Sequence, residues 1–472
     1  MMPDAKSRWK WHWLLPVWPT SWWGGTLLLA PLLLWFSYQP IIRLGRNASM
    51  NFELSLALIY VAVLGVISLG VIWRERRHLK GNWLVYLVAA FTLYSAVSVV
   101  WSSNRLRGVL VAGVTALLAV AVIALKLRQA EVKRLLPSLR RLLMVGATVV
   151  AVLAIGQFVG GIWWSTCHGQ PNLWLCLGCT VAQFGFVRPN GLAIEPQFLG
   201  NLMLLPSLLI LWRYLNRRAS RLEVGLGLLY VVIIFLTLSR GAIYALGLGF
   251  VVLWVLHYRQ WRRGLVSAGW LVLAFIVSLG LQCVAAQLSQ YHVSWYDTTS
   301  RVVEQLSLNK IKLPKRAAPV ISPAPVSTQP APRYSGYVAE STNVRVAFSH
   351  DALIIWHHNL TSQLFGTGLG SFGVELAKLH HSTWTKEIVQ NEFIEVLQER
   401  GLVGLLLLLG LIGYLIYRGR RSSLMLALLA AFVAQYCFFS GLPNALHVFI
   451  ALGVLFSAAS SQHLPKGLKE NA

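Results

Sequence analysis

The stretch VVIIFLTLSRGAIYALGLGFVVLWVL, residues 231–256, is apolar except for Arg240 near its middle, and residues 224–256 carry no other charge. One helix over that range would be about 50 Å long, well beyond the roughly 30 Å of a bilayer's hydrocarbon core. Two short helices fit if they meet at residues 238–241, with the glycine supplying a tight reversal. The stretch therefore predicts two membrane spans joined by a turn that carries an arginine.

The composition of the whole chain predicts the same environment. The 472 residues are 56% hydrophobic and only 12% charged, whereas soluble domains carry about 25% charge. We therefore predict an all-α, polytopic membrane protein with about 12 transmembrane helices. The first apolar stretch lacks a small-residue cleavage site, so we expect a retained helix rather than a signal peptide. The spans are expected near 22–41, 53–73, 83–101, 108–125, 142–163, 192–212, 223–239, 241–256, 264–283, 401–417, 423–439 and 446–461.

The chain has a net charge of +25, and the positions of its Lys and Arg residues indicate its topology in the membrane. Alternate loops are rich in Lys and Arg, while the short loops between them carry few. By the positive-inside rule both termini are expected in the cytoplasm. We accordingly expect no nucleic-acid partner.

One long segment, about 284–400, is then expected on the periplasmic face between spans 9 and 10. Residues 313–333 hold six prolines and predict an extended linker, which two helices near 341–361 and 385–400 follow. The expected organisation is spans 1–9 in residues 1–283, the periplasmic segment in 284–400, and spans 10–12 with a cytoplasmic tail in 401–472. Cys167, Cys176 and Cys179 share a periplasmic loop, where a disulfide is possible and a zinc site is less favoured.

Arg240 should lie at the outer mouth of the bundle, below the headgroups because the flanking spans are short. An unpaired arginine at that depth costs a few kcal/mol. The side chain could snorkel to lipid phosphates. Alternatively it lines an outward-facing cavity and holds an anion, since a guanidinium matches phosphate bidentately.

A second polar group lies at the same face, in FVRPNGLAIEPQFLGNLMLLP (186–206). Arg188, Asn190, Glu195, Gln197 and Asn201 fall at or just inside the bilayer, where such groups usually face the bundle interior. Pro189 and Pro196 favour a broken helix start. An interfacial helix cap is the plainer alternative.

A third group lies in the long outer segment. TNVRVAFSHDALIIW (342–356) carries Arg345 near its start, and the glycine-rich LFGTGLGSF (364–372) follows. EIVQNEFIEVLQERGLVG (387–404) then places Glu392, Glu395 and Glu399 on one helical face. A surface amphipathic helix is the alternative, but anionic lipids favour basic faces.

Taken in order, four of these pieces resemble the O-antigen ligase and O-antigen polymerase superfamily of bacterial membrane glycosyltransferases. They are RPNGLAIEPQFLGN, the LSRG turn, Arg345 with FGTGLGSF, and QNEFIEVLQERGLVG, spread over about 142–461. The resemblance implies transfer of a glycan from an undecaprenyl diphosphate carrier to an acceptor sugar on lipid A core, a glycan chain or a protein. It also implies that Arg240 and Arg345 bind the diphosphate. Membrane lipids are the other expected partners.

The resemblance further implies that Asn391, Gly401 and Gly404 belong to a motif that begins with a His-Asn pair. Gln390 replaces that histidine here, and a glutamine cannot accept a proton at neutral pH. Glu392 or Glu395 could be the base instead, as could His380 or His381. The candidate catalytic residues are thus Gln390, Asn391, Glu392 and Glu395, with Arg188, Arg240 and Arg345 for the diphosphate and Glu195 for another part of the substrate.

The expected chemistry is direct displacement of a lipid diphosphate, with fixed guanidinium groups stabilising the developing charge. The outer face has no Asp-x-Asp pair, so we expect a metal-independent reaction without a cofactor. A transporter or flippase of lipid-linked glycan and a non-catalytic polysaccharide assembly protein are the alternatives. Against a transporter, no ionisable residue lies centrally in an expected span. The motifs do not distinguish a ligase from a polymerase or name the sugars.

Overall fold

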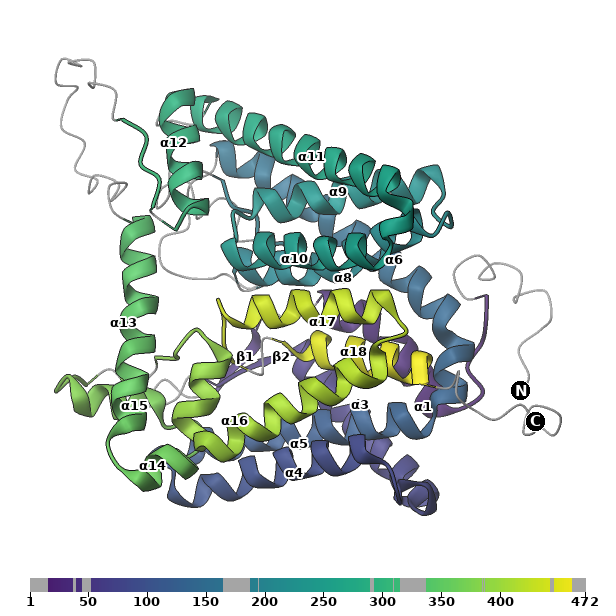
Figure 1. Cartoon of the computed structure of the whole chain (residues 1–472), viewed down its shortest axis with the longest axis vertical. Coiled ribbons are helices and arrows are strands. Elements are labelled where there is room, and N and C mark those ends of the chain that lie inside the picture. Colours follow the sequence, from purple (N-terminus) through teal and green to yellow (C-terminus); the bar gives the residue numbers. More distant parts are fainter. Residues whose placement is uncertain are drawn as a thin grey trace.

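The structure is a computed structural model that describes residues 16–36, 40–44, 52–163, 187–193, 195–288, 293–308, 310–314, 337–383, 385, 387–441 and 445–460. Cys167, Cys176, Cys179 and most of the proline-rich linker lie outside the described residues. The described chain is predominantly helical, as the sequence predicts. Its helices form one layered bundle, with a group of shorter helices at one end (Figure 1).

The N-terminal part supplies six α-helices and a hairpin. The helices are α1 (Trp22–Leu28), α2 (Ala30–Phe36), α3 (Leu56–Glu75), α4 (Trp83–Val97), α5 (Arg105–Leu127) and α6 (Gln129–Trp163), with 3-10 turns η2 (Arg76–Leu79) and η3 (Ser98–Trp101). The hairpin pairs β1 (Pro40–Leu44) antiparallel with β2 (Phe52–Ser55). It departs from the all-α prediction because so short an extended stretch is a weak signal beside long apolar runs.

The middle part supplies α8 (Pro196–Leu215), α9 (Arg221–Leu236), α10 (Arg240–Leu256), the turn η4 (Tyr258–Gln260) and α11 (Trp261–Leu288). Pro196 begins α8 at a position where its missing N–H is not needed. Ser220 and Glu223 form a capping box that begins α9. These local signals determine where α8 and α9 start.

The long outer segment and the C-terminal part complete the bundle. They comprise α12 (Trp295–Leu306), α13 (Tyr337–His357), α14 (Leu360–Phe365), α15 (Phe372–Leu379), α16 (Glu392–Gly419), α17 (Ser423–Tyr436) and α18 (Leu446–Ser460). Helices α12 to α15 gather at the left of Figure 1, and α13, α14 and α15 all contact α16. The expected helix near 341–361 corresponds to α13, whereas the expected helix near 385–400 is the first part of α16.

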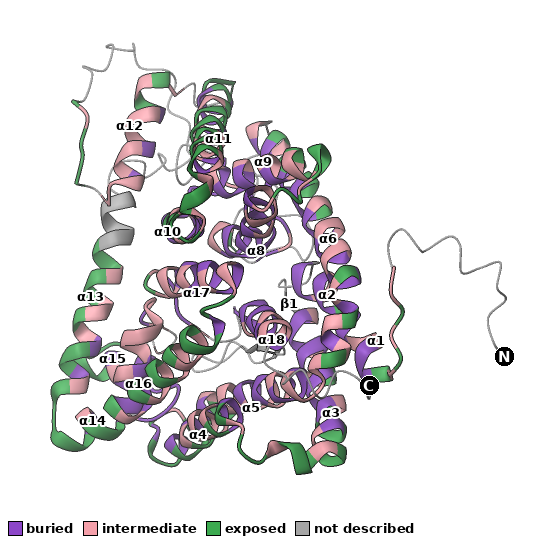
Figure 2. Cartoon of the chain, turned by 45° about the vertical axis from the view of Figure 1, so that its right-hand side comes forward, coloured by how far each residue is buried: buried purple, intermediate pink, exposed green. Residues whose placement is uncertain are grey.

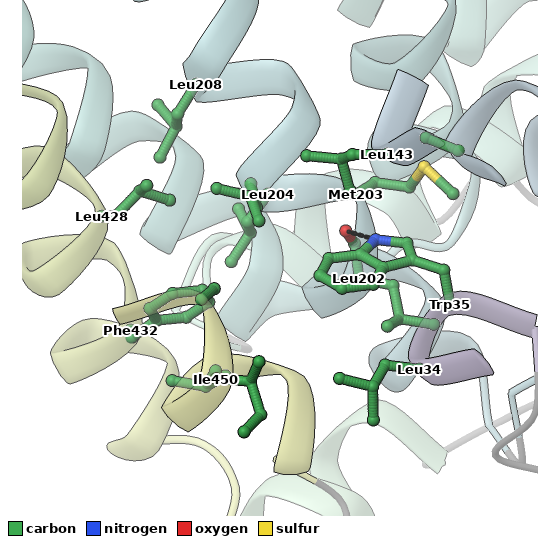
Figure 3. Close-up of a cluster of buried hydrophobic side chains, with 14 of the residues drawn as sticks. Leu34, Trp35, Leu143, Leu202, Met203, Leu204, Leu208, Leu428, Phe432 and Ile450 are labelled. Atoms are coloured by element: carbon green, nitrogen blue, oxygen red, sulfur yellow. Dashed lines mark hydrogen bonds between the residues drawn. The ribbon is translucent and has the colours of Figure 1, made fainter. Parts of the chain in front are cut away.

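The core of the bundle surrounds α8, which is the most enclosed of the long helices. Its apolar window is 83% buried, against 22% for α11 at the edge (Figure 2). Leu202, Met203, Leu204 and Leu208 of α8 pack with Phe432 of α17 and Ile450 of α18 (Figure 3). Trp35 closes one side of this cluster by donating its indole N–H to the backbone oxygen of Leu202 at 2.9 Å. The elements flanking α8 are therefore held in fixed relation to one another.

Seven helices are long and apolar enough to cross a membrane, and every expected span overlaps a helix among the described residues. The seven ranges are Leu56–Leu79, Trp83–Trp101, Arg105–Leu127, Gln129–Ile162, Pro196–Leu215, Tyr258–Leu288 and Glu392–Gly419. Helices α9, α10, α17 and α18 are shorter than the roughly 20 residues of a typical span. Twelve spans thus stays a prediction. One expected basic loop, 126–141, is largely helical because α6 begins at Gln129.

The outer faces of the bundle are apolar, as a lipid environment requires. Large hydrophobic side chains lie exposed on α3, α4 and α11, including Val66, Leu93 and Ile276. Such a surface is rarely left open to water in a soluble protein. The fold is that of a multi-pass membrane protein.

Candidate functional site

Arg240 is the first residue of α10. Ser239 caps the helix, its side-chain oxygen accepting a hydrogen bond from the backbone N–H of Ala242 at 3.4 Å. Arg240 itself is only 4% exposed. Protein therefore encloses this residue, which favours a role inside the bundle over snorkelling to lipid phosphates.

The reversal before Arg240 is made by Leu238 and not by glycine, which corrects the expectation from the sequence. Leu238 has φ +48°, while Gly241 lies within α10. A leucine in this region is strained. Val302 of α12 packs on its side chain, and Gln305 donates to its backbone oxygen at 3.3 Å, so the outer segment holds the turn in place.

Gly241 is required for a different reason, the close packing of α10 on α17. A Cβ at this position would lie 2.9 Å from the Cβ of Phe438 and 3.0 Å from Oε1 of Gln435. The LSRG sequence thus combines a strained residue, a helix cap, a buried arginine and a contact that only glycine permits.

Arg188 is tied to the same turn. Its Nε donates to the backbone oxygen of Thr237 at 2.8 Å. Behind it, Gln157 of α6 holds the neighbouring turn through hydrogen bonds of 2.7 Å to both the N–H and the carbonyl oxygen of Gly191. The chain before α8 therefore folds back, which brings Arg188 beside the turn that carries Arg240.

Glu195 and Arg345 meet through Gln197. Glu195 is exposed at the N-cap of α8 and accepts from Nε2 of Gln197 at 2.8 Å. Arg345 of α13 is partly buried and donates from Nη2 to Oε1 of Gln197 at 3.4 Å. Glu195 and Arg345, which are 150 positions apart in the sequence, thus both hydrogen-bond to the side-chain amide of Gln197.

The acidic residues lie at the start of α16. Gln390 has φ +59°, and Asn391 caps the helix by accepting from the N–H groups of Phe393 and Ile394. Oε2 of Glu392 accepts from the N–H of Gly441 at 3.0 Å. Oε2 of Glu395 accepts from the Ser440 hydroxyl at 2.6 Å. Asn391 therefore has a structural role in aiming the carboxylates.

Segment 435–441, the end of α17 and the loop after it, joins the two halves of the site. Gln435 and Phe438 pack on Gly241 beside Arg240, and Phe439 packs edge-on against Phe198 in the first turn of α8. The same segment holds the start of α16 through the backbone oxygen of Cys437, the Ser440 hydroxyl and the Gly441 N–H. The arginine turn and the acidic helix start thus share one connecting element.

The two histidines proposed as alternative bases are placed differently. His380 is exposed at the end of α15, and its Nε2 lies 2.9 Å from a carboxylate oxygen of Asp351. His381 is exposed with φ +49°. His380 contacts Asp351 on α13, whereas Glu392 and Glu395 both contact segment 435–441.

The glycine-rich loop has a structural explanation. Gly366, Gly368 and Gly370 all have positive φ, and Gly368 donates to the backbone oxygen of Glu399 at 2.8 Å. A Cβ at Gly368 would lie 2.4 Å from Cα of Ser102. The loop packs between α16 and the α4–α5 turn, so it supports the acidic helix near Glu399.

Gly401 kinks α16 where that loop docks, with φ +65° and ψ −168°. We expect Gly401→Ala to lower the free energy of unfolding by at least about 1–3 kcal/mol, because the residue is strained there and its Cβ would lie 2.3 Å from the Leu364 oxygen. Thermal unfolding in detergent measures the effect. Gly410→Ala is the control, since a Cβ there meets nothing within 4 Å. Equal stability of the two variants would contradict the structural role of the kink.

Two buried polar residues lie near the site: Asn201, which the sequence had indicated, and Arg400, which it had not. Asn201 is 1% exposed, and its side-chain amide has no hydrogen-bond partner among the described residues. Arg400 is 3% exposed, packs over the ring of Phe91 at 5.2 Å and interacts electrostatically with Glu392 and Glu399. Arg400 directly precedes the expected span 401–417 and the kink at Gly401. The sequence pattern does not reveal that its side chain is buried.

Within the described part of the chain, no three His, Cys, Asp or Glu side chains are grouped closely enough to hold a metal ion. A reaction without metal stays a prediction from the sequence. The apolar pattern around Cys283 and Cys437 predicts two buried thiols; Cys283 is buried, but Cys437 is exposed.

The fold and the grouped polar residues define a multi-pass membrane protein with a polar site at the end of its bundle where α8 and α10 begin. Residues 225–409, from α9 into α16, match the family model described as O-antigen ligase. This match confirms the resemblance to the O-antigen ligase superfamily of membrane glycosyltransferases over those residues. No curated protein matches the chain significantly.

Proposed function

We propose that this protein transfers a glycan from an undecaprenyl diphosphate carrier to an acceptor sugar on the periplasmic face of the bacterial inner membrane. The observation that carries the proposal is segment 435–441, which contacts both the Arg240 turn and the acidic start of α16. A transferase of this kind needs cations at the leaving diphosphate and a base at the acceptor hydroxyl. Here one segment contacts both the turn that carries Arg240 and the start of α16 that carries Glu392, which supports this assignment.

In this proposal Arg240 and Arg345 bind the diphosphate, with Arg188 supporting the turn. The guanidinium groups stabilise the charge that develops on the leaving oxygens as the glycosidic bond breaks. Arg345 reaches the start of α8 through Gln197, and Glu195 contacts the same amide. Glu195 is therefore proposed to orient Arg345 or a nearby sugar hydroxyl.

Glu392 is proposed as the base that accepts the proton of the acceptor hydroxyl. Glu395 is bound by both the Ser440 hydroxyl and the Val389 N–H, so it is better suited to holding the loop. Glu392 accepts one backbone hydrogen bond and lines an apolar cavity. Gln390, which replaces the family histidine, is proposed to contact substrate without transferring a proton.

That apolar cavity supports a lipid-linked donor. It has a volume of about 130 Å³ and lies among α4, α5, α16, α17 and α18, with Phe91, Phe393 and Tyr436 in its wall. An isoprenoid chain suits such a lining. A carrier chain lying here would end near the start of α16, which segment 435–441 connects to the Arg240 turn.

The proposed orientation can be tested by labelling single cysteines in a cysteine-free variant. We expect Thr361→Cys in α14 to react in intact cells with a maleimide that does not cross the inner membrane, and Lys80→Cys to react only after lysis. Both positions are exposed, so accessibility of the side chain does not distinguish them. The reverse pattern would place the site on the cytoplasmic face.

The acceptor can be identified from the surface glycan of a deletion strain. If the protein is a polymerase, its loss leaves single repeat units attached at the surface. If it is a ligase, its loss leaves long chains on the carrier. Normal amounts and lengths of both surface and carrier-linked glycan in the deletion strain would contradict the proposed transfer.

A further inference from the structure

A cavity of about 630 Å³ lies at the opposite end of α8 from Glu195. Residues of α1, α2, α6, α8, α17 and α18 line it, including Trp35, Leu143, Leu209 and Ile450. Helix α8 is 20 residues long, so its two ends are about 30 Å apart. This cavity is therefore separate from the site at the arginine turn.

The rim of the cavity is strongly basic. Its cations come from α6, the end of α8, the loop that follows, and the α16–α17 loop; they are Lys133, Arg140, Arg213, Arg218 and Arg421. The described residues that line the cavity include no carboxylate. Arg140 and Arg213 repel each other, and Glu223, outside the lining, pairs with Arg213 at 3.0 Å. The rim thus has an excess of positive charge that an anion would relieve.

The interior of the cavity is apolar, in contrast to its rim. Leu136, Leu143, Leu205 and Val454 face it, and Trp35 and Trp212 add aromatic surface. The Trp212 indole N–H is satisfied by Ser423 at 3.0 Å, so its ring can lie against an apolar ligand without losing a hydrogen bond. The cavity therefore suits a molecule with an anionic head and an apolar chain.

We propose that this cavity binds an anionic phospholipid, with its phosphate among the rim cations and an acyl chain against the apolar interior. Guanidinium groups bind phosphate oxygens bidentately, and basic pockets between transmembrane helices bind anionic headgroups. The cavity lies at the end that the loop charges place in the cytoplasm, where anionic headgroups are available. The bound lipid would link α6, α8, α17 and α18.

Native mass spectrometry of the full chain in detergent tests the proposal. We expect dioleoyl phosphatidylglycerol to remain bound at one molecule per chain, with at least about tenfold higher occupancy than dioleoyl phosphatidylcholine. The variant K133Q/R140Q should lose about tenfold or more of that occupancy, since each cation contributes to headgroup binding. The matched control R77Q/K80Q removes two exposed cations of the η2 region outside the cavity and should bind as the unmodified protein does.

Two results would overturn the proposal. Equal retention of the two lipids by the unmodified chain would show that the apolar interior alone binds them. Displacement of phosphatidylglycerol by millimolar inorganic phosphate would indicate a site for a soluble anion. Both comparisons use the unmodified protein, so the test holds even if the double variant fails to fold.

Discussion

Replacing Glu392 with glutamine should slow glycan transfer by about 10²–10⁴-fold, the usual contribution of a general base. Glutamine keeps the size of the side chain and an oxygen that can accept from the Gly441 N–H, but it cannot take the acceptor's proton. The loss should therefore appear in the turnover rate, with donor binding largely unchanged. The measurement compares the rate of glycan transfer in membranes that contain equal amounts of the unmodified protein and of the Glu392→Gln variant.

The matched control for this variant is Glu375→Gln. Glu375 lies on α15 and pairs with Lys378 at 2.8 Å, away from segment 435–441. A second test adds Gln390→His to Glu392→Gln, which restores the family histidine at a backbone conformation that histidine tolerates. Partial recovery of the rate would support a base at this helix start. Full activity of the Glu392→Gln variant alone would contradict this assignment and would indicate that Glu395 or His380 is the base.

Replacing Arg240 with alanine should lower transfer by about 10²–10³-fold, as the loss of one preorganised donor does elsewhere. Arg240 is buried at a helix start fixed by Ser239, Leu238 and α12, so its position is set before the donor binds. Arg240→Lys should recover only part of the rate because an ammonium group lacks the bidentate fork. The rate of undecaprenyl diphosphate release measures both variants.

Arg105→Ala is the control for the arginine variants. Arg105 begins α5 on the face expected to be periplasmic, and it is exposed. A decrease equal to that of Arg240→Ala would indicate a general effect of lost surface charge rather than a diphosphate site.

Much of the fold could be predicted because apolar length and loop charge are strong local signals. The split at Arg240 followed from length alone, and α9 and α10 end and begin within a few residues of it. The residue that makes the reversal could not be predicted. Glycine is the usual choice for such a turn, but α12 holds Leu238 in the strained conformation, and that contact joins positions about 64 residues apart.

The candidate site was predictable in its parts but not in its assembly. The polar groups near 188–197, 240, 345 and 390–395 were conspicuous against apolar sequence. Segment 435–441, which connects two of them, consists of ordinary residues such as Ser440 and Gly441, and only packing gives them a role. Arg400 was missed as a site residue for the same reason, since burial of a polar group is a tertiary property.

The most direct test of the central claim measures outward-facing, carrier-linked glycan in cells that hold Arg240→Ala at the normal protein level. The account predicts that surface glycan falls sharply while glycan on undecaprenyl diphosphate accumulates on the periplasmic face. Intact surface glycan with the variant protein present would contradict both the transfer and the diphosphate site. Loss of surface glycan without such accumulation would point instead to a flippase or transporter.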